Sequence, residues 1–387
     1  MLKLKKEKNK THNFLCWAGW LPHQAKPYEG IFIKNHLEIL GQLCQLRVFT
    51  VRHVKSFRFK NSASLQSFGI LSIWEIPYLF PFKFLGYLLI PLIEFVKATR
   101  SKKLIGFIQY ISFPYLIFAQ ILKIFGLKKI ILIEHWSGYT KVDNRFYRLP
   151  AWYRSLLKWS IRSCQQIFVV SEFLKHEMIS ACNVPDVRFT VISNVIRMPQ
   201  KVEIKSLNPR SVQNFKILTI ANLIDKIKNI SLLISVMQTI RAQIPGVELH
   251  VVGEGPDRLF LEKLTEECNL QSQVFFHGTV ENEKIQEFYF SCHVFALLSN
   301  YETFSVATAE ALAHGRPVLV TRCGGPQEYV TQECGVLVNP GSKEDAVKGF
   351  LFLYDNYEKF DALSIAQYAR ERFSLEKIKN EFLKISF

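Results

Sequence analysis

The sequence predicts an α/β protein built from two Rossmann-like, doubly wound domains that face each other across a cleft. The chain has 387 residues, more than one core comfortably fills, and its hydrophobic content of 49% is ample for two cores. Short apolar runs also alternate with amphipathic stretches along the chain. Such alternation is typical of parallel sheets that helices cover on both faces. In these sheets, ligands bind beyond the carboxyl ends of the strands.

The alternation is clearest in the second half of the chain. Apolar runs such as KILTIANL (216–223), VELHVVG (247–253) and RPVLVT (316–321) are separated by stretches with helical periodicity. Gly315 and Pro317 together form a helix stop signal. These runs predict the strands of one parallel sheet and the helices between them.

The first half shows the same alternation less regularly. Residues 53–69 have no clear period, and we expect an irregular excursion there. We place the domain boundary near residues 193–200, where an apolar strand gives way to a polar segment that contains a proline. We therefore expect an N-terminal domain over 1–195, a C-terminal domain over 196–365, and a last helix in 366–387 that packs back on the N-terminal domain.

Positive charge is concentrated in the first half of the chain. Residues 1–200 hold 29 Lys and Arg against 10 Asp and Glu, whereas the remainder holds 20 against 23, and the net charge is +16. This asymmetry predicts an anionic partner. Nucleic acid is not expected, because no helix-turn-helix, zinc-finger or aromatic RNP pattern occurs. The same half is rich in aromatic residues and leucine, which favours peripheral contact with an anionic membrane.

Two apolar stretches, 76–96 and 104–127, are long enough to span a bilayer, but prolines and charged or amide residues interrupt both. A spanning helix, a half-inserted peripheral face and an ordinary buried helix remain open, and the interruptions favour the last two. The basic N-terminus is not followed by an apolar signal region. The eight cysteines never form C-x-x-C. We therefore expect reduced thiols, no metal site and a cytoplasmic protein at the inner face of the cell membrane.

The segment 300–315 carries the strongest chemical signal. An apolar strand ends there, a loop follows, and a helix begins near Ser305. The free N–H groups and positive dipole end of such a helix form a site for a diphosphate. Glu302 lies in the loop and Glu310 inside the helix, so one carboxylate can reach a sugar hydroxyl and the other a ribose. Two isolated carboxylates of this kind are also typical of a solvated surface helix.

The stretch ETFSVATAE (302–310) resembles the paired-glutamate motif of the retaining glycosyltransferases of family four, which have the two-Rossmann GT-B architecture. Five further stretches resemble family segments in the same order: PYEGIFIKNHLEIL (27–40), EHWSGY (134–139), ANLIDKIKNISLLI (221–234), VVGEGP (251–256) and CGGPQEYV (323–330). The resemblance covers most of the chain and is densest between about residues 190 and 345. It implies an N-terminal acceptor-binding domain and a C-terminal nucleotide-sugar-binding domain.

The resemblance implies three catalytic residues. Glu302 would bind hydroxyls of the donor sugar, Lys228 would neutralise the leaving diphosphate, and His135 would lie near the anomeric carbon. A lone histidine such as His135 is more typical of a protein core, and only the surrounding motifs favour the functional reading. The donor-binding residues implied in the same way are Gly30, Asn222, Val280, Phe304, Ser305, Val306 and Glu310. Among these, Gly30 lets the backbone approach the phosphates, Val280 lies beside the base and Glu310 binds the ribose.

One position departs from the family pattern. Asn222 stands where many relatives have a phosphate-binding arginine, so either Lys228 carries more of the leaving-group charge or Lys226 helps. No Asp-x-Asp pair occurs in the chain, and we expect a metal-independent reaction without a cofactor. Retention of configuration is implied by the resemblance alone. Because no nucleophile is evident, a front-face displacement is expected.

These inferences predict a transferase that moves a sugar from a nucleotide diphosphate donor to a glycan or lipid-linked acceptor, in the synthesis of cell-surface polysaccharide or glycoconjugates. A nucleotide-sugar epimerase of the same architecture is one alternative. A non-catalytic, membrane-associated partner subunit is another. An NAD-dependent dehydrogenase is not expected, because VVGEGP (251–256) lacks the third glycine of the dinucleotide fingerprint.

Overall fold

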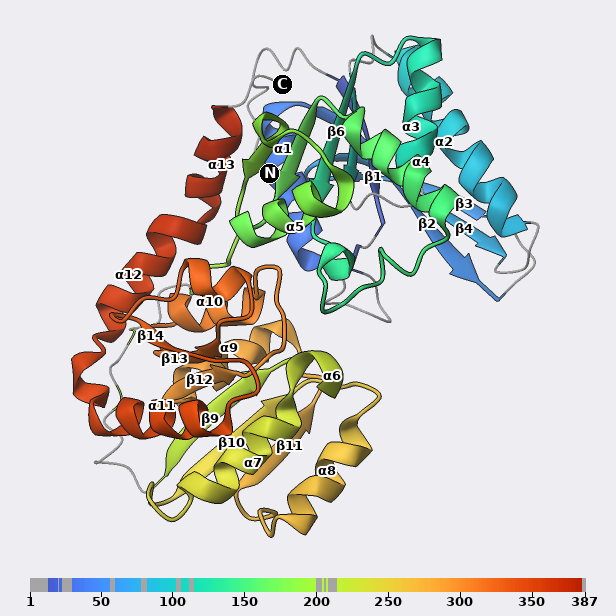
Figure 1. Ribbon diagram of the computed structural model, residues 1–387. Coiled ribbons are helices and arrows are strands. Elements are labelled where there is room, and N and C mark those ends of the chain that lie inside the picture. The colour runs from blue at the N-terminus through green and yellow to red at the C-terminus, as the bar shows by residue number, and fades with distance from the viewer. Residues whose placement is uncertain are drawn as a thin grey trace. The chain divides into compact units, whose positions relative to one another are not determined.

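The computed structural model forms two compact α/β units (Figure 1). The first comprises Met1–Val170, Leu174–Ile192 and Lys379–Phe387, and the second comprises Ser171–Phe173 and Ser193–Ile378. The structure describes residues 13–19, 21–22, 30–55, 60–77, 82–101, 106–110, 115–199, 204, 207 and 214–384. Each unit contains a central sheet of mainly parallel strands.

The described part of the first unit holds an eight-stranded sheet with the order β3-β4-β2-β1-β5-β6-β7-β8. All neighbours are parallel except β3 and β4. Its strands are β1 (Asn13–Ala18), β2 (Gln45–Val54), β3 (Lys60–Gln66), β4 (Gly69–Pro77), β5 (Gly106–Tyr110), β6 (Lys129–Glu134), β7 (Gln166–Val169) and β8 (Phe189–Val191).

The irregular excursion expected over 53–69 was wrong. The segment contains the end of β2, all of β3 and the turn into β4, and β3 and β4 form an antiparallel hairpin at the edge of the sheet. Every residue of β3 is exposed. An edge strand of this kind has no buried face, so it lacks the apolar alternation that would reveal it in sequence.

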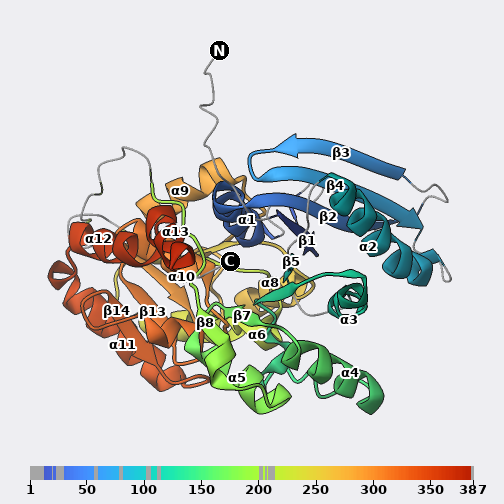
Figure 2. The same ribbon diagram turned by 90° about the horizontal axis from the view of Figure 1, so that it is seen from above.

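Helices cover both faces of this sheet (Figure 2). On one face lie α2 (Phe82–Ser101), α3 (Tyr115–Leu122), α4 (Ala151–Arg162) and α5 (Glu172–Cys182), and on the other α1 (Ile31–Leu43) and α13 (Leu375–Leu383). Phe382 of α13 packs against His36 of α1 and Phe168 of β7, with ring centroids 5.8 and 5.6 Å apart. From β1 the chain moves to β2 on one side, and from β4 it returns past β1 to β5, β6, β7 and β8 on the other side. Because crossovers are right-handed, those that run in opposite directions place their helices on opposite faces of the sheet.

The apolar stretch 104–127 does not form one helix, as its length alone would allow. It contains β5, α3 and the short 3₁₀ helix η1 (Lys123–Phe125). By contrast, α2 runs through most of the stretch 76–96 and beyond it, with Pro91 inside the helix. Among the described residues, no helix is long and apolar enough to cross a membrane.

The described part of the second unit holds a six-stranded parallel sheet with the order β11-β10-β9-β12-β13-β14. Its strands are β9 (Phe215–Ile220), β10 (Val247–Val252), β11 (Val274–Gly278), β12 (Val294–Leu297), β13 (Val318–Thr321) and β14 (Gly335–Val338). All residues of β12 and β13 are buried, as expected for strands that helices cover on both faces.

The helices of this unit also divide between two faces. One face carries α6 (Asp225–Lys228), α7 (Ile230–Ile240), α8 (Arg258–Glu267) and α11 (Lys343–Asp355), and the other carries α9 (Asn282–Ser291), α10 (Val306–Ala313) and α12 (Ala362–Phe373). The predicted fold class, an α/β protein with two doubly wound, Rossmann-like sheets, is confirmed.

Candidate active site

The loop between β12 and α10 is held by a neighbouring glycine pair. The Glu302 N–H donates to the Cys323 carbonyl at 2.9 Å, and the Gly325 N–H donates to the Glu302 carbonyl at 2.9 Å. A Cβ atom at Gly324 would lie 2.5 Å from the Glu302 carbonyl oxygen, and one at Gly325 would lie 2.4 Å from that of Thr303. Only glycine therefore allows this approach, which fixes the backbone of Glu302.

The carboxylate of Glu302 has two donors on the same oxygen. Lys228 Nζ lies 2.6 Å from Oε1, and the Ser299 hydroxyl donates to Oε1 at 2.8 Å. Lys228 is the last residue of α6, and Ser299 follows the end of β12. Within the described residues no hydrogen bond to Oε2 is found. The arrangement holds the carboxylate rigidly and leaves one oxygen for a hydroxyl of a ligand.

The amino end of α10 lies directly after this loop. Ser305 has a left-handed backbone with φ of 66°, and its hydroxyl bonds to Thr308 Oγ1 at 2.8 Å. Tyr329 donates its hydroxyl to the carbonyls of Phe304 and Ser305 at 2.7 and 3.0 Å. No described side chain caps the helix. The first N–H groups of α10, beginning at Val306, are therefore available to an anion.

Glu310 lies on α10 and is half-buried. Desolvation by burial raises its pKa to about 7, while a hydrogen bond from Tyr289 and the charge of Arg197 act in the opposite direction. The Tyr289 hydroxyl donates to Glu310 Oε2 at 3.0 Å. The structure thus places Glu310 on the same helix as the anion-accepting N–H groups, with a carboxyl group that titrates near neutral pH.

Asn222 follows the end of β9 and is exposed. Lys226 is exposed as well, and its carbonyl accepts a hydrogen bond from Asn300 Nδ2 at 2.9 Å. Val280 is half-buried in the loop between β11 and α9. These residues share the carboxyl edge of the sheet with Glu302. Lys228, however, is the lysine of this segment that bonds to Glu302.

The glycines of VVGEGP have a packing role that sequence reasoning missed. A Cβ atom at Gly253 would lie 1.9 Å from the Ala221 carbonyl oxygen, and one at Gly255 would lie 2.4 Å from that of Leu223. The loop after β10 therefore packs tightly on the segment that carries Asn222. This close backbone contact accounts for both glycines.

His135 lies in the first unit, directly after β6. Its ring packs between Phe32 and His36 of α1, at centroid distances of 4.5 and 5.6 Å. Burial, and secondarily the neighbouring His36, lower its pKa well below the usual 6.5. The imidazole is therefore neutral at neutral pH. The Glu134 carboxylate accepts the N–H groups of His135 and Trp136, both at 2.9 Å, and so fixes this strand end.

Gly30 begins α1, the helix that carries Phe32 and His36. Its φ of 68° and ψ of 22° lie in the left-handed region, and its carbonyl accepts the N–H groups of Ile33 and Lys34 at 3.0 and 3.1 Å. A side chain would be strained there. In the first unit, the structure thus groups His135 with the helix that Gly30 starts.

Sequence reasoning did not identify several polar residues around the predicted ones: Glu134, Tyr289, Ser299 and Tyr329. They belong to different elements and share no short motif. A weak signal existed for Ser299, which follows an apolar strand at the carboxyl edge of the sheet, where polar residues are typical of sites.

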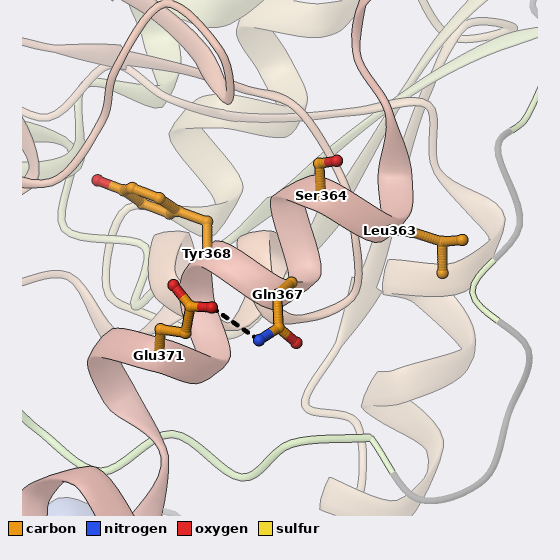
Figure 3. A pocket seen from close by; sticks show the side chains of 5 residues that line it. All are labelled: Leu363, Ser364, Gln367, Tyr368 and Glu371. Carbon is orange, nitrogen blue, oxygen red and sulfur yellow. Dashed lines mark hydrogen bonds between the residues drawn. The ribbon is translucent and has the colours of Figure 1, made fainter.

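No group of three or more His, Cys, Asp or Glu side chains that could hold a metal ion occurs among the described residues. A shallow hollow on α12 is lined by Leu363, Ser364, Gln367, Tyr368 and Glu371 (Figure 3). Gln367 there donates to Glu371 at 2.8 Å. This hollow contains none of the predicted site residues.

Comparisons with known proteins relate the chain to glycosyltransferases. The family model described as glycosyl transferases group 1 matches residues 201–372, and the model described as glycosyltransferase family 4 matches residues 41–198. An uncharacterised glycosyltransferase of Methanocaldococcus jannaschii is 30% identical over 198 residues, which are 48% of this chain and 50% of that protein. The sulfoquinovosyl transferase of Arabidopsis thaliana is 31% identical over 165 residues, or 40% of this chain and 30% of that protein. The matches span half or less of these relatives.

Solved structures share the fold. Sucrose-phosphate synthase from Thermosynechococcus elongatus has a TM-score of 0.72 at 16% identity, covering 96% of this chain and 98% of that one. Anabaena HepE, solved with UDP and glucose, has a TM-score of 0.71 at 17% identity, with coverage of 96% and 98%. Two family models cover the two halves of the chain, and both sheets have the expected topology. The chain belongs to the family-four glycosyltransferases of GT-B architecture.

Proposed function

We propose that this chain is a retaining, metal-independent glycosyltransferase of the hexosyltransferase type. It moves a sugar from a nucleoside diphosphate donor to a glycan or lipid-linked acceptor, in the synthesis of cell-surface polysaccharide or glycoconjugates. The observation that carries this proposal is the 2.6 Å pair of Lys228 and Glu302 beside the uncapped amino end of α10. A cation, a helix dipole and a fixed carboxylate there suit a sugar diphosphate.

The proposed step breaks the bond between the anomeric carbon and the diphosphate oxygen. The electron pair of that bond passes to the leaving oxygen, and Lys228 and the N–H groups from Val306 onward stabilise the growing charge. The acceptor hydroxyl forms its bond to the anomeric carbon on the same face, and its proton passes to the leaving phosphate oxygen. Glu302 holds sugar hydroxyls through Oε2, while Glu310 accepts the ribose hydroxyls.

Other predicted residues fit around this step. The backbone of Phe304, Ser305 and Val306 contacts the sugar and phosphate in this proposal, Val280 borders the base, and Asn222 adds a neutral donor. From the acceptor-binding first unit, we assign Gly30 to close backbone approach and the neutral His135 to the region of the anomeric carbon. A neutral imidazole there can donate or accept one hydrogen bond without placing a charge beside a developing cation.

The names of similar proteins support the donor and acceptor classes. Anabaena HepE has been solved with UDP-glucose. The human relative, 30% identical over 116 residues and 24% of that protein, is named as one of the subunits of phosphatidylinositol N-acetylglucosaminyltransferase. Both a lipid acceptor and the basic first half of this chain favour peripheral contact with the inner face of the cell membrane.

The donor is tested by thermal shift with UDP-, GDP- and ADP-sugars, followed by transfer of labelled sugar to membrane lipid extracts and glycans. One nucleotide class should raise the melting temperature in proportion to the logarithm of its concentration. Label should then appear on an acceptor, with retained anomeric configuration by NMR. Release of epimerised or free nucleotide sugar without transfer would instead identify an epimerase. No shift with any donor would support the non-catalytic partner.

A further inference from the structure

The outer face of α2 is apolar, although it is exposed. Leu89, Leu92, Ile93 and Val96 follow the spacing i, i+3, i+4, i+7 and are 38–42% exposed. The opposite face is buried, with Phe95 at 6% exposure. A surface helix that is apolar on both faces implies that something apolar covers it.

The neighbouring elements continue this surface. In η1, directly after α3, Ile124 is 82% exposed and Phe125 is 61% exposed. On α4, Trp152 is 69% exposed and Trp159 is 52% exposed. Figure 2 shows α2, α3 and α4 side by side on one face of the sheet, and all of them belong to the first unit. Exposed Trp and Phe beside aliphatic residues are typical of a surface that meets a bilayer.

The sequences of these elements carry more positive than negative charge. Their only carboxylate is Glu94, which is fully buried and bonded to Lys97 Nζ at 2.9 Å and Trp74 Nε1 at 3.0 Å. Seven Lys and Arg occur in the sequences of α2, η1 and α4: Lys83, Lys97, Arg100, Lys123, Arg154, Lys158 and Arg162. An apolar surface with cations and no exposed carboxylate suits anionic lipid.

A basic hollow of about 440 Å³ lies at the carboxyl end of α4. Its lining includes Lys123, Arg162 and Arg188 and contains no carboxylate. Lys123 Nζ donates to the Ser163 carbonyl at 3.0 Å, and Arg188 Nη1 donates to the Cys164 carbonyl at 3.3 Å. The free carbonyls at the carboxyl end of a helix together carry about half a unit of negative charge, whereas Lys123, Arg162 and Arg188 carry three positive charges. Within the described chain, none of the three cations pairs with a carboxylate.

We propose that this hollow binds the phosphate headgroup of an anionic phospholipid while Ile124 and Phe125 insert into the bilayer beside it. The lipid, and not a soluble phosphate, is the ligand because two strongly exposed apolar residues of the surface, Ile124 and Phe125, directly follow Lys123. The hollow lies at the amino edge of the sheet, before β6, β7 and β8, whereas His135 follows β6. The inference deepens the proposed membrane contact and is independent of the donor site.

The test is sedimentation of the full chain with phosphatidylcholine vesicles, with and without phosphatidylglycerol, at low and high salt. Arg162 also bonds to a backbone carbonyl, because its Nε donates to that of Cys182 at 2.8 Å. Lys123→Gln, Arg162→Gln and Arg188→Gln each remove one charge but keep an amide N–H donor. Each should weaken binding to anionic vesicles about fivefold, and the triple variant on the order of a hundredfold. Ile124→Ser with Phe125→Ser should weaken it at least about tenfold.

Matched controls come from the second unit. Leu259→Ser with Phe260→Ser removes an adjacent apolar pair of similar exposure, 80% and 54%, and Lys263→Gln and Lys348→Gln remove highly exposed cations. These variants should bind vesicles within twofold of the parent chain, on the order expected for remote sites. Equal loss of vesicle binding in the control variants and in the variants of the hollow would overturn the proposed lipid site.

Two further results would overturn the lipid assignment. One is loss of vesicle binding in the cation variants with unchanged binding in the Ile124–Phe125 variant, together with calorimetric binding of inorganic phosphate by the parent chain. The other is no binding to either kind of vesicle. Thermal shift with the donor is measured on the same variants. An unchanged thermal shift with the donor shows that the donor site is intact, and this conclusion does not depend on the vesicle result.

Discussion

Glu302 combines a fixed position with one oxygen open to a ligand. Two donors hold Oε1, so the remaining oxygen is oriented without any cost at the moment of reaction. Glu302→Gln keeps the shape of the side chain but removes the charge that balances Lys228, and Glu302→Ala removes both. We expect both to lower turnover about a hundredfold or more in a sugar-transfer assay.

The matched control for this prediction is Glu281→Gln, because that side chain is 77% exposed. It should retain parental turnover. Parental turnover in Glu302→Ala would remove Glu302 from the chemistry, whatever its place in the motif.

Lys228 and Lys226 are separated by two positions but have different surroundings. Lys228 bonds to Glu302 with its side chain 22% exposed, whereas Lys226 is exposed. Loss of the cation that meets a leaving diphosphate should cost about 3 kcal/mol in the barrier, so Lys228→Ala should slow turnover on the order of a hundredfold. Lys226→Ala should stay near the parental rate at saturating donor.

The exposed Asn222 provides the rescue experiment. Asn222→Arg places a cation at the position where the family resemblance implies a phosphate-binding arginine, and it should partly restore the rate of Lys228→Ala. If Lys226 shares the charge, the double variant Lys226→Ala, Lys228→Ala should be slower than the product of the single effects. Unchanged rates in Lys228→Ala and in the double variant would exclude both lysines.

The ionisation of Glu310 makes the stability of the folded chain depend on pH. Its pKa is about 7 in the folded chain against an ordinary 4.5, so between these values the unfolded chain releases a proton that the folded chain keeps. Stability therefore falls as pH rises from about 4.5 to 7, and the penalty is complete above 7. Partial solvent access reduces this effect, and we expect a loss of about 2 kcal/mol in the free energy of unfolding above pH 7.

Urea unfolding at pH 5 and pH 8 checks this value. Glu310→Gln should be more stable than the parent chain at pH 8, and most of this gain should disappear at pH 5. Glu267→Gln, whose side chain is 60% exposed, is the control and should show little gain at either pH. The same gain in stability at both pH values would mean that a difference in packing, and not the ionisation of Glu310, makes the Glu310→Gln variant more stable.

At the scale of elements, sequence predicted what depends on local pattern. The burial of β12 and β13 and the helix start at Ser305 follow from apolar runs and a strand–loop–helix order, so they were predictable. The strand β3 was not, because its exposed residues leave no periodic signal. The contact of Ser299 with Glu302 depends on a side-chain direction that no spacing rule gives.

The glycine pair after β13 determines where the loop between β12 and α10 lies. Gly325→Ala would place a Cβ atom 2.4 Å from the Thr303 carbonyl oxygen, which is backbone and cannot rotate away. We expect a loss of about 2–3 kcal/mol in the free energy of unfolding, and a fall in turnover because the loop that carries Glu302 must move.

Gly126→Ala is the contrasting variant. Gly126 has a φ of 94° and open space around its Cβ position, so alanine there costs only backbone strain, about 1 kcal/mol. Turnover should be unaffected. If Gly325→Ala loses stability but keeps parental turnover, the glycine pair supports the fold and does not position Glu302.

At the scale of the whole molecule, the net positive charge comes from the first half of the chain, whereas residues 201–387 carry a slightly negative net charge. The proposed donor carries a diphosphate, so in our proposal its site in the second unit depends on local cations and N–H groups. Lys228 and the amino end of α10 supply them. This local supply, and not the net charge of the molecule, is what the reaction would use.

The same reasoning predicts how the enzyme responds to chelators. A divalent metal ion can stabilise a leaving diphosphate, and one or two carboxylates together with the phosphates usually hold such an ion. In our proposal, Lys228 and the N–H groups of α10 take the place of such an ion, and the carboxylate of Glu302 is already bonded to Lys228. Turnover should therefore persist in excess EDTA, within about twofold of the untreated rate.

The measurement is initial rate at saturating donor, with and without EDTA, followed by addition of Mg²⁺ or Mn²⁺. A Lys228→Ala variant measured in parallel should remain slow under every condition. Complete loss of parental activity in EDTA that manganese restores would show that a metal, and not Lys228, neutralises the leaving group.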